Sequence, residues 1–434
     1  MGSLLSYELK KILKRPFTIV VCVGALAVMV FFTLFAASQM FTYAWGPDVY
    51  GSYEAIPQDK LDSAQGDYGL AGQQDGALMY TGLDAIRMEQ EYYKSFEGSW
   101  DNERLRQIAS DYQAYNSNPD IYTEEIDTWA LQMREWTLGE EMSPEEIKAY
   151  NEANPIYVMK PEYQYGEYQK WFAVSDLLDE YVINPDDSIN SFEEAFPLVE
   201  QPAVFEYHAG PQFTAQMQNV FVGIMVILML IAGAAPIFSD EVACRTEPML
   251  LAARYGRDKL VRAKILSGVL FALGSLLVLT VVNVLLNGAI YGFSGYNMPI
   301  QLDTFTYSMP FALTYLEYLF VILGFQVLGL CAMAALVMLL STLMRSAIPV
   351  VFASGLFAVV ITLLSTMGGG WTRYLSQTLP PGAASPDALL TEALVDGWGK
   401  LAVPQWILAI IVCAAIFVVS ILVITRKYKA LSKV

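Results

Sequence analysis

Six long apolar runs constrain this chain more than any other feature of its sequence. Each run has about 20 residues or more with few charges, which is the length that a helix needs to cross the hydrocarbon core of a bilayer. We therefore predict six transmembrane helices, at 16–38, 219–238, 264–292, 315–341, 346–367 and 404–425.

Composition indicates the same class of protein. Of the 434 residues, 55% are hydrophobic and 16% are charged, which is too apolar for an ordinary soluble protein. The first run has an apolar core of about 20 residues, whereas a secretory signal peptide has about 7–15, so we expect an uncleaved first span. The expected fold is an all-α polytopic membrane protein.

Charge divides the chain into two parts. Residues 40–215 hold 34 of the 44 acidic residues but 9 of the 26 basic ones, so the remainder is basic. Such a division implies that the two parts lie in different compartments.

The basic residues near the span ends predict the topology, because short cytoplasmic segments are enriched in Lys and Arg. Both termini and the segment between spans 2 and 3 are basic, while the loop at 292–314 has no Lys or Arg. We predict cytoplasmic termini, an extracellular acidic region and a multi-pass protein of the plasma membrane, with a bacterium as the expected source. The basic residues used are Lys10, Lys11, Lys14, Arg15, Arg245, Arg254, Arg257, Lys259, Arg262, Lys264, Arg345, Arg426, Lys427, Lys429 and Lys433.

These boundaries predict three parts. Residues 1–38 form an interfacial helix, with Leu5, Leu9, Ile12 and Leu13 on one face, and the first span. Residues 39–215 form the extracellular domain. Residues 216–434 form spans 2 to 6, with a cytoplasmic loop at 239–264 and an outer loop at 368–403.

The extracellular domain is predicted to be mainly helical. Apolar residues recur at helical spacing in 105–115, 126–133 and 168–178, and Ser143 followed by Pro144 is a helix start. The domain contains no cysteine, so it must be held together by packing and not by disulfides.

The predicted spans contain few polar side chains. Asn283 and Asn287 lie one turn apart in the third span, Gln326 lies in the fourth, and Glu317 lies near the outer end of the fourth. Such residues line a pathway or join helices, and for the two asparagines we favour hydrogen bonding between helices.

No motif in the chain predicts catalysis. A phosphate-binding loop, a His-Glu-x-x-His motif and a Gly-x-Ser-x-Gly motif are all absent from the sequence. The single histidine, His208, has no cysteine near it and does not predict a zinc site. We expect no catalytic residue, no metal, no cofactor bound by this chain and no binding of nucleic acid, so that any energy comes from another chain.

The segment at 239–266 is charged and lies between two apolar runs. Thr246 with Glu247 and Pro248 suits the start of a short helix, and Met249–Ala253 gives that helix an apolar surface before Tyr255-Gly256 ends it. A short helix of this kind is either an interfacial connector or a docking helix for a cytoplasmic partner.

This segment resembles the cytoplasmic loop between the second and third spans of type-2 ABC exporter permeases. That family shows Glu, then Gly-Thr, Leu-Leu, Arg and a Lys that opens the third span. Arg245 stands where the family has Gly, and Tyr255-Gly256 replaces a small residue followed by Pro. The matching residues here are Glu241, Thr246, Leu250, Leu251, Arg257 and Lys264.

The resemblance covers about 1–38 and 217–434, including the outer elements around 379–390, and does not cover the large acidic domain. It implies a transport subunit that pairs with a second copy or a sister permease and docks cytoplasmic ATPase subunits, which bind the ATP and Mg²⁺. Some permeases of this broad family, including ones tied to the export of antimicrobial peptides of the lantibiotic type and to self-protection, carry extra extracellular domains. Coupling to the ATPase is expected at Glu241, Thr246, Glu247, Met249, Leu250, Leu251, Arg254 and Arg257.

The resemblance thus implies a permease that moves an amphipathic or lipid-like substrate out of the cell or out of the membrane. An alternative of another class is a membrane-anchored receptor whose extracellular domain binds a ligand and signals through partner subunits. The basic loop would then only determine the topology. An intramembrane enzyme is disfavoured, because the spans lack paired catalytic groups.

The predicted topology can be tested with Cys244, which lies in the segment at 239–266, after Cys22, Cys331 and Cys413 have been replaced by Ser. A membrane-impermeant maleimide should label Cys244 only after the cells are permeabilised. In a chain that also carries Ser117→Cys, it should label the acidic region in intact cells. Labelling of Cys244 in intact cells would contradict the topology.

Overall fold

The computed structural model is mostly helical and contains six helices that are long and apolar enough to cross a membrane. The chain divides into two compact units, residues 1–36 with 208–434 and residues 37–207. The residues described are 2–58, 77–138, 143–160, 163, 169–171, 174, 178, 196–246, 249, 259–303, 306, 309–391, 395–398 and 401–431.

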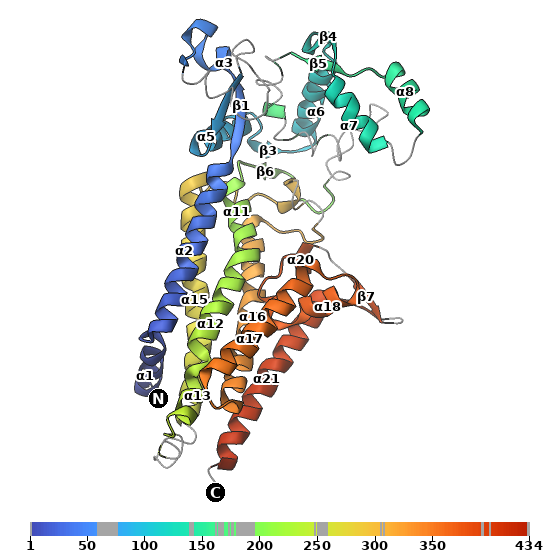
Figure 1. Ribbon diagram of the computed structural model, residues 1–434. Helices are drawn as coiled ribbons and strands as arrows, with labels where there is room; N and C mark the ends of the chain where they lie inside the picture. Colours follow the sequence, from blue (N-terminus) through green and yellow to red (C-terminus); the bar gives the residue numbers. More distant parts are fainter. Residues whose placement is uncertain are drawn as a thin grey trace. The chain divides into compact units, whose positions relative to one another are not determined.

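The first unit is a bundle of spans (Figure 1). All six predicted spans are found, and both chain ends lie at the same end of the bundle as α13. The helices are α1 (Gly2–Leu13), α2 (Pro16–Gln39), α11 (Ala209–Met217), the π-helix η4 (Gln218–Val222), α12 (Gly223–Ala234), α13 (Pro236–Ala243), α15 (Lys259–Tyr291), η5 (Ile300–Leu302), α16 (Tyr315–Leu343), α17 (Ala347–Met367), α18 (Trp371–Thr378), α19 (Pro380–Ala383), α20 (Asp387–Thr391) and α21 (Gln405–Leu431).

The second span is the centre of the bundle. It is one helical stretch, Ala209–Ala243, made of α11, η4, α12 and α13. Among the 18 residues of its most apolar stretch, 72% are buried by other parts of the protein. The corresponding share is 17% in span 1 and 22% in spans 5 and 6, so these three spans have most of their surface on the outside of the bundle. The second span therefore starts about ten residues before the predicted Asn219, because polar residues at 212–219 continue the same helix.

Pro236 divides α12 from α13, and neighbouring spans compensate for it. A proline cannot donate to the carbonyl four residues earlier, here that of Ala232. The hydroxyl of Thr18 on α2 donates to this carbonyl at 3.3 Å. Ser341 on α16 accepts from the backbone N–H groups of Phe238 and Ser239 at 3.1 and 3.0 Å, which fixes α13 against α16.

The loop between spans 5 and 6 returns into the bundle. Residues 380–384 are buried, and a Cβ atom built on Gly223 of α12 would collide with the carbonyl oxygen of Ala384. A Cβ atom built on Gly329 of α16 would likewise come within 2.7 Å of the Pro380 carbonyl oxygen of α19. Irregular backbone between membrane-spanning helices is tolerated only where protein or water surrounds it. The two glycines have no side chains, so the spans can pack closely around this loop.

The unit at 37–207 combines helices with small antiparallel sheets, which the sequence analysis did not predict. The pairs are β1–β2, β3–β6 and β4–β5, and a further pair, β7 (Val395–Trp398) with β8 (Leu401–Pro404), belongs to the bundle unit. The other elements are β1 (Phe41–Trp45), α3 (Gly46–Tyr50), η1 (Tyr53–Ala55), β2 (Ala77–Thr81), α5 (Leu83–Lys94), β3 (Gly98–Trp100), α6 (Asn102–Asn116), η2 (Pro119–Ile121), β4 (Tyr122–Ile126), α7 (Thr128–Leu138), α8 (Pro144–Ala153), β5 (Tyr157–Met159) and β6 (Ala203–Phe205).

An aromatic core holds this unit together. The Trp100 ring is fully buried and stacks on Phe205 at 4.3 Å between centroids, and its Nε1 donates to the carbonyl of Phe96 at 2.9 Å. Leu105 and Ile108 of α6 are buried, as the helical spacing predicted. Packing of this kind replaces the disulfides that the unit lacks.

The helix start predicted at Ser143 is confirmed, and the helix predicted at 126–133 is confirmed in part. Ser143 and Glu146 form the expected capping box at the start of α8. The helical spacing at 126–133 is only partly right, because Ile126 ends β4, and Trp129 and Met133 of α7 are 69% and 44% exposed. The helix predicted at 168–178 falls mainly outside the described residues.

Glu89 in α5 gives this unit a pH-dependent stability. Burial raises the pKa of Glu89 above its ordinary value of 4.5, and the hydrogen bond from the Tyr207 hydroxyl, at 3.0 Å, opposes that shift. A raised folded-state pKa means that the contribution of Glu89 is present below the unfolded-state pKa and is lost as the pH rises through the folded-state pKa, by about 1.4 kcal/mol per pKa unit.

We therefore expect Glu89→Gln, which keeps an acceptor for Tyr207, to raise the unfolding temperature near neutral pH and to flatten its decline between about pH 4 and pH 7. Thermal unfolding followed by tryptophan fluorescence measures this. Glu103→Gln, at an exposed position of α6, is the control and should leave the profile unchanged. An unaltered profile in Glu89→Gln would contradict the assignment.

Candidate functional site

The structure describes three of the eight predicted coupling residues, and they lie in or after the last turn of span 2. Glu241 is buried in the last turn of α13, and Met249 is 77% exposed. Thr246 follows α13, and its hydroxyl donates to the Glu241 carbonyl at 3.4 Å. Glu247, Leu250, Leu251, Arg254 and Arg257 lie outside the described residues.

The two ends of the segment at 239–264 are joined by a buried ion cluster. The Nζ atom of Lys264, in the second turn of α15, lies 2.5 Å from Glu241 Oε1 and 3.3 Å from Glu8 Oε2 of α1. The Lys264 side chain is 1% exposed. It also donates to the carbonyl of Ile237 at 2.9 Å, so one ammonium group links α1, α13 and α15.

Two further pairs complete the charge balance of this cluster. Arg15 lies 2.8 Å from Asp240, and Lys11 lies 3.8 Å from Glu241. Burial lowers the pKa of Arg15, and the nearby carboxylates of Asp240, Glu8 and Glu241 oppose that shift. Three basic and three acidic side chains thus neutralise one another. We call Glu8, Lys11, Arg15, Asp240, Glu241 and Lys264 the basal ion cluster.

The buried face of α1 differs from the predicted apolar face. Ile12 is buried as expected, but Leu13 is 54% exposed and Glu8 is buried instead. Glu8, Lys11 and Arg15 follow one another at spacings of three and four residues, so they lie on the same side of the chain. The prediction used helical spacing alone and therefore assigned only apolar residues to the buried face. The sequence does not show that Lys264 is the partner of Glu8, so the burial of Glu8 was not expected.

The end of α13 has the geometry of a Schellman motif. Arg245 has a φ of 59°, in the left-handed region that favours glycine. The N–H of Thr246 donates to the Glu241 carbonyl at 3.0 Å, and the N–H of Arg245 donates to the Val242 carbonyl at 3.1 Å. This turn ends α13 after Ala243.

A second group of buried polar residues lies within the spans. Gln218 of η4 is its centre: its Nε2 donates to Thr280 at 2.8 Å and to Gln326 at 2.7 Å, and its Oε1 accepts from Asn283 at 3.1 Å. Asn287 donates to Asn283 at 2.8 Å. The network therefore joins spans 2, 3 and 4 by side-chain hydrogen bonds.

The structure brings three of the four predicted span residues together in this network, namely Asn283, Asn287 and Gln326. Glu317 is elsewhere, because it caps α16: its carboxylate accepts from the backbone N–H of Thr314 at 2.9 Å. Gln326 also donates to the Ala384 carbonyl at 3.3 Å, so the network reaches the segment that follows α19.

Gln218 and Glu8 are the important residues that the sequence analysis missed. Gln218 was placed one residue before the predicted second span, although the polar run of Gln216, Gln218 and Asn219 was a usable signal. Glu8 is the one acidic residue in a basic amphipathic helix, and its negative charge among positive ones was the available signal.

Both arrangements join helices that are separate in the sequence. Among the residues that the structure describes, no group of three His, Cys, Asp or Glu side chains could hold a metal ion. The four cysteines are free thiols. The basal ion cluster joins the two ends of the segment at 239–264, and the polar network joins span 2 to spans 3 and 4.

Comparison of the chain with protein-family profiles, with curated proteins and with solved structures gives no match.

Lys264→Met should destabilise the bundle, because it leaves Glu8 and Glu241 buried without their shared cation. Removal of one partner from a buried ion pair costs about 3–5 kcal/mol. The triple variant Glu8→Gln, Glu241→Gln, Lys264→Met should recover most of this loss. Thermal unfolding of the purified protein in detergent measures both effects.

Arg87→Met is the matched control, since it breaks an ion pair with Asp84 whose side chains are 74% and 58% exposed. It should change the unfolding temperature little, because exposed pairs contribute about 0–1 kcal/mol. Equal effects of Lys264→Met and Arg87→Met would contradict a structural role for the basal ion cluster.

Proposed function

We propose that this chain is the membrane-spanning permease subunit of an ATP-driven exporter of the type-2 ABC class. The observation that carries the proposal is the fixed attachment of the segment at 239–264. Its sequence is similar to the exporter loop that docks the ATPase, and Lys264 and Glu241 join its two ends in a buried pair 2.5 Å apart.

A docking segment can move the spans only if its two ends are attached rigidly to them. Because Glu8, Glu241 and Lys264 lie on three different helices, a displacement of the segment moves α1, α13 and α15 together. Ser341 ties α13 to α16, and Gln218 ties span 2 to spans 3 and 4. A push at the cytoplasmic end would therefore reach the opposite end of the bundle.

The local geometry at Arg245 also favours the proposal. The exporter family has Gly-Thr at this place, and the left-handed φ of 59° at Arg245 is the conformation that glycine adopts most readily. The chain direction after Glu241 that the family pattern implies is thus available here, although Arg replaces Gly.

The proposal assigns the remaining parts as follows. ATP and Mg²⁺ bind to separate cytoplasmic ATPase subunits, and a second copy or a sister permease completes the pathway. The acidic unit at 37–207 lies outside the plasma membrane of a bacterial cell. The cargo is amphipathic, of peptide or lipid type, and the transport serves export or self-protection. Spans 1, 5 and 6, with the least buried apolar windows, offer surface for lipid or for the second permease.

The docking helix can be tested with Leu250→Asp combined with Leu251→Asp. The purified chain should bring down an ATP-hydrolysing subunit in mild detergent, and the double variant should lose at least about 90% of that subunit, since two charges disrupt an apolar contact. Arg345→Asp, in the turn after span 4 at the same end of the bundle, is the control and should retain the subunit.

ATP hydrolysis by this chain alone would contradict the proposal. Full retention of the ATPase by the Leu250→Asp, Leu251→Asp variant would show that the segment is not the docking site. If wild-type chain binds no ATPase but responds to an external ligand, the receptor hypothesis replaces the exporter.

A further inference from the structure

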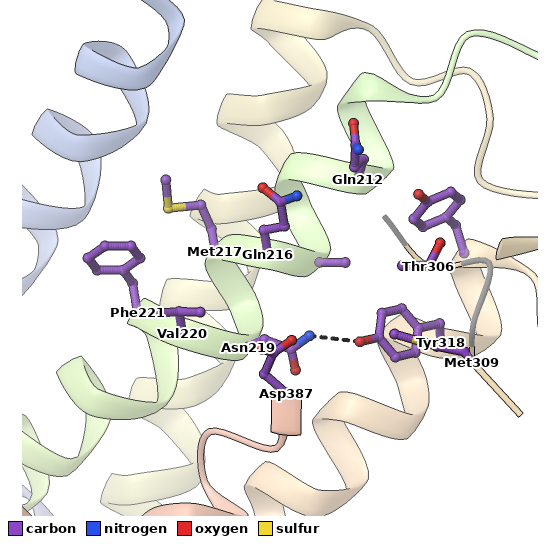
Figure 2. Close-up of a pocket in the computed structure, with 12 residues that line it drawn as sticks. Gln212, Gln216, Met217, Asn219, Val220, Phe221, Thr306, Met309, Tyr318 and Asp387 are labelled. Carbon is purple, nitrogen blue, oxygen red and sulfur yellow. Dashed lines mark hydrogen bonds between the residues drawn. The ribbon is translucent and has the colours of Figure 1, made fainter. Parts of the chain in front are cut away.

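A cavity of about 390 Å³ lies beside α11 and α20, at the end of the bundle away from α13 (Figure 1 and Figure 2). Its wall comes from span 2 at 212–221, from the start of α16, from the loop before α16 and from α20. The volume is within the range of small-molecule sites. All of the described lining residues belong to the bundle unit.

The cavity has an apolar side and a polar side. Figure 2 shows Met217, Val220 and Phe221 on one side of the η4 turn. Asn219, Tyr318 and Asp387 lie together on the other side. An amphipathic ligand could therefore contact both groups of side chains.

Asn219 lines this cavity and carries a hydrogen-bond acceptor that has no partner. The residue is 2% exposed, and its Nδ2 donates to the Tyr318 hydroxyl at 2.9 Å. Its Oδ1 is buried and has no hydrogen-bond partner. Buried acceptors are normally satisfied, so an unsatisfied one beside a cavity indicates the place of an N–H or O–H donor.

The backbone around Asn219 is also unusual. Asn219 lies in η4, a π-helical turn within an otherwise α-helical span. Such turns are rare and occur frequently at functional sites, because the inserted residue changes the direction of its neighbours' side chains.

The charges around the cavity favour a cation. Asp387 is exposed at the rim, close enough to interact electrostatically with Tyr318. The described lining residues include no Lys or Arg. Behind the wall, Asp303 lies 3.9 Å from His208 and accepts a hydrogen bond from Tyr315, so the nearest imidazole faces a second carboxylate.

The apolar side continues to the outer surface of the bundle at Val220 and to α2 at Phe221. Val220 is 43% exposed, and the Phe221 ring stacks on Phe32 of α2 at 5.2 Å between centroids. An alkyl chain that leaves the cavity along Val220 and Phe221 would remain in the hydrocarbon region of the membrane.

We infer that this cavity binds the head of a primary alkylammonium amphiphile. The ammonium group donates to Asn219 Oδ1 and to the Asp387 carboxylate, and the alkyl chain lies along Met217, Val220 and Phe221. Binding requires this chain alone and does not depend on the proposed ATPase partner.

Dodecylammonium binding to the full-length protein in phosphatidylcholine nanodiscs tests the inference. Dodecylammonium should bind at least about tenfold more tightly than dodecyltrimethylammonium, which has the same charge but no N–H donor, and dodecyl sulfate should bind no better than the latter. Equal binding of the two cations, or tighter binding of the sulfate, would overturn it.

Two variants locate the site. Asp387→Asn keeps the shape of the side chain and removes its charge, and Asn219→Leu removes the unused acceptor. Each should weaken dodecylammonium binding about tenfold or more. Asp120→Asn, an exposed change in the unit at 37–207, should not. If Asn219→Leu does not fold, Asp387→Asn decides alone, and its unchanged affinity would overturn the inference.

The ammonium head could come from a lipid or from a free amphiphile. Nanodiscs with phosphatidylethanolamine, whose headgroup is a primary ammonium, separate the two sources. Weaker apparent affinity for dodecylammonium there supports the site and identifies the lipid as its occupant. An unchanged affinity supports the site as one for free amphiphiles.

Discussion

The arrangement of the bundle depends on one ammonium group. Lys264 is 1% exposed, and a charge so deeply placed is stable only when it is paired and hydrogen-bonded. Glu8, Glu241 and the Ile237 carbonyl supply these contacts from helices that are far apart in the sequence. Because the three helices must meet for this charge to be neutralised, the cluster specifies how α1 and the ends of spans 2 and 3 come together.

The same constraint, that polar groups away from water need partners, explains the interior of the bundle. Gln218 contacts Thr280, Asn283 and Gln326, and Thr18 donates to the carbonyl that Pro236 leaves without an N–H partner. Gln326 also donates to the Ala384 carbonyl, which gives the loop that returns into the bundle a partner of the same kind. Asn219 Oδ1 is one of several buried atoms that depart from this rule, and Asn219 is also a residue of the cavity wall.

Much of the fold could be predicted from the sequence because span length and charge asymmetry are strong signals. All six spans were predicted, and Leu105 and Ile108 were expected on the buried face of α6. The start of span 2 was predicted too late, because hydropathy falls at Gln218 while the helix continues. The small sheets were missed, because strands of three to five residues show too little alternation to be recognised.

The candidate site could be predicted only in part. Asn283 and Gln326 were identified from their polarity within apolar runs, but their shared partner Gln218 was not. Lys264 was used as a determinant of topology, and its pairing with Glu8 spans 256 positions of sequence. No periodicity reports contacts of this kind, because they depend on how whole helices pack.

The position of Gln218 at the centre of the polar network has a consequence for biogenesis. Gln218 enters the bilayer with span 2, but its partner Gln326 is synthesised 108 residues later. Until span 4 arrives, the amide has no complete set of partners in lipid. Span 2 should therefore remain beside the insertion machinery, or at the water interface, until translation has passed the fourth span.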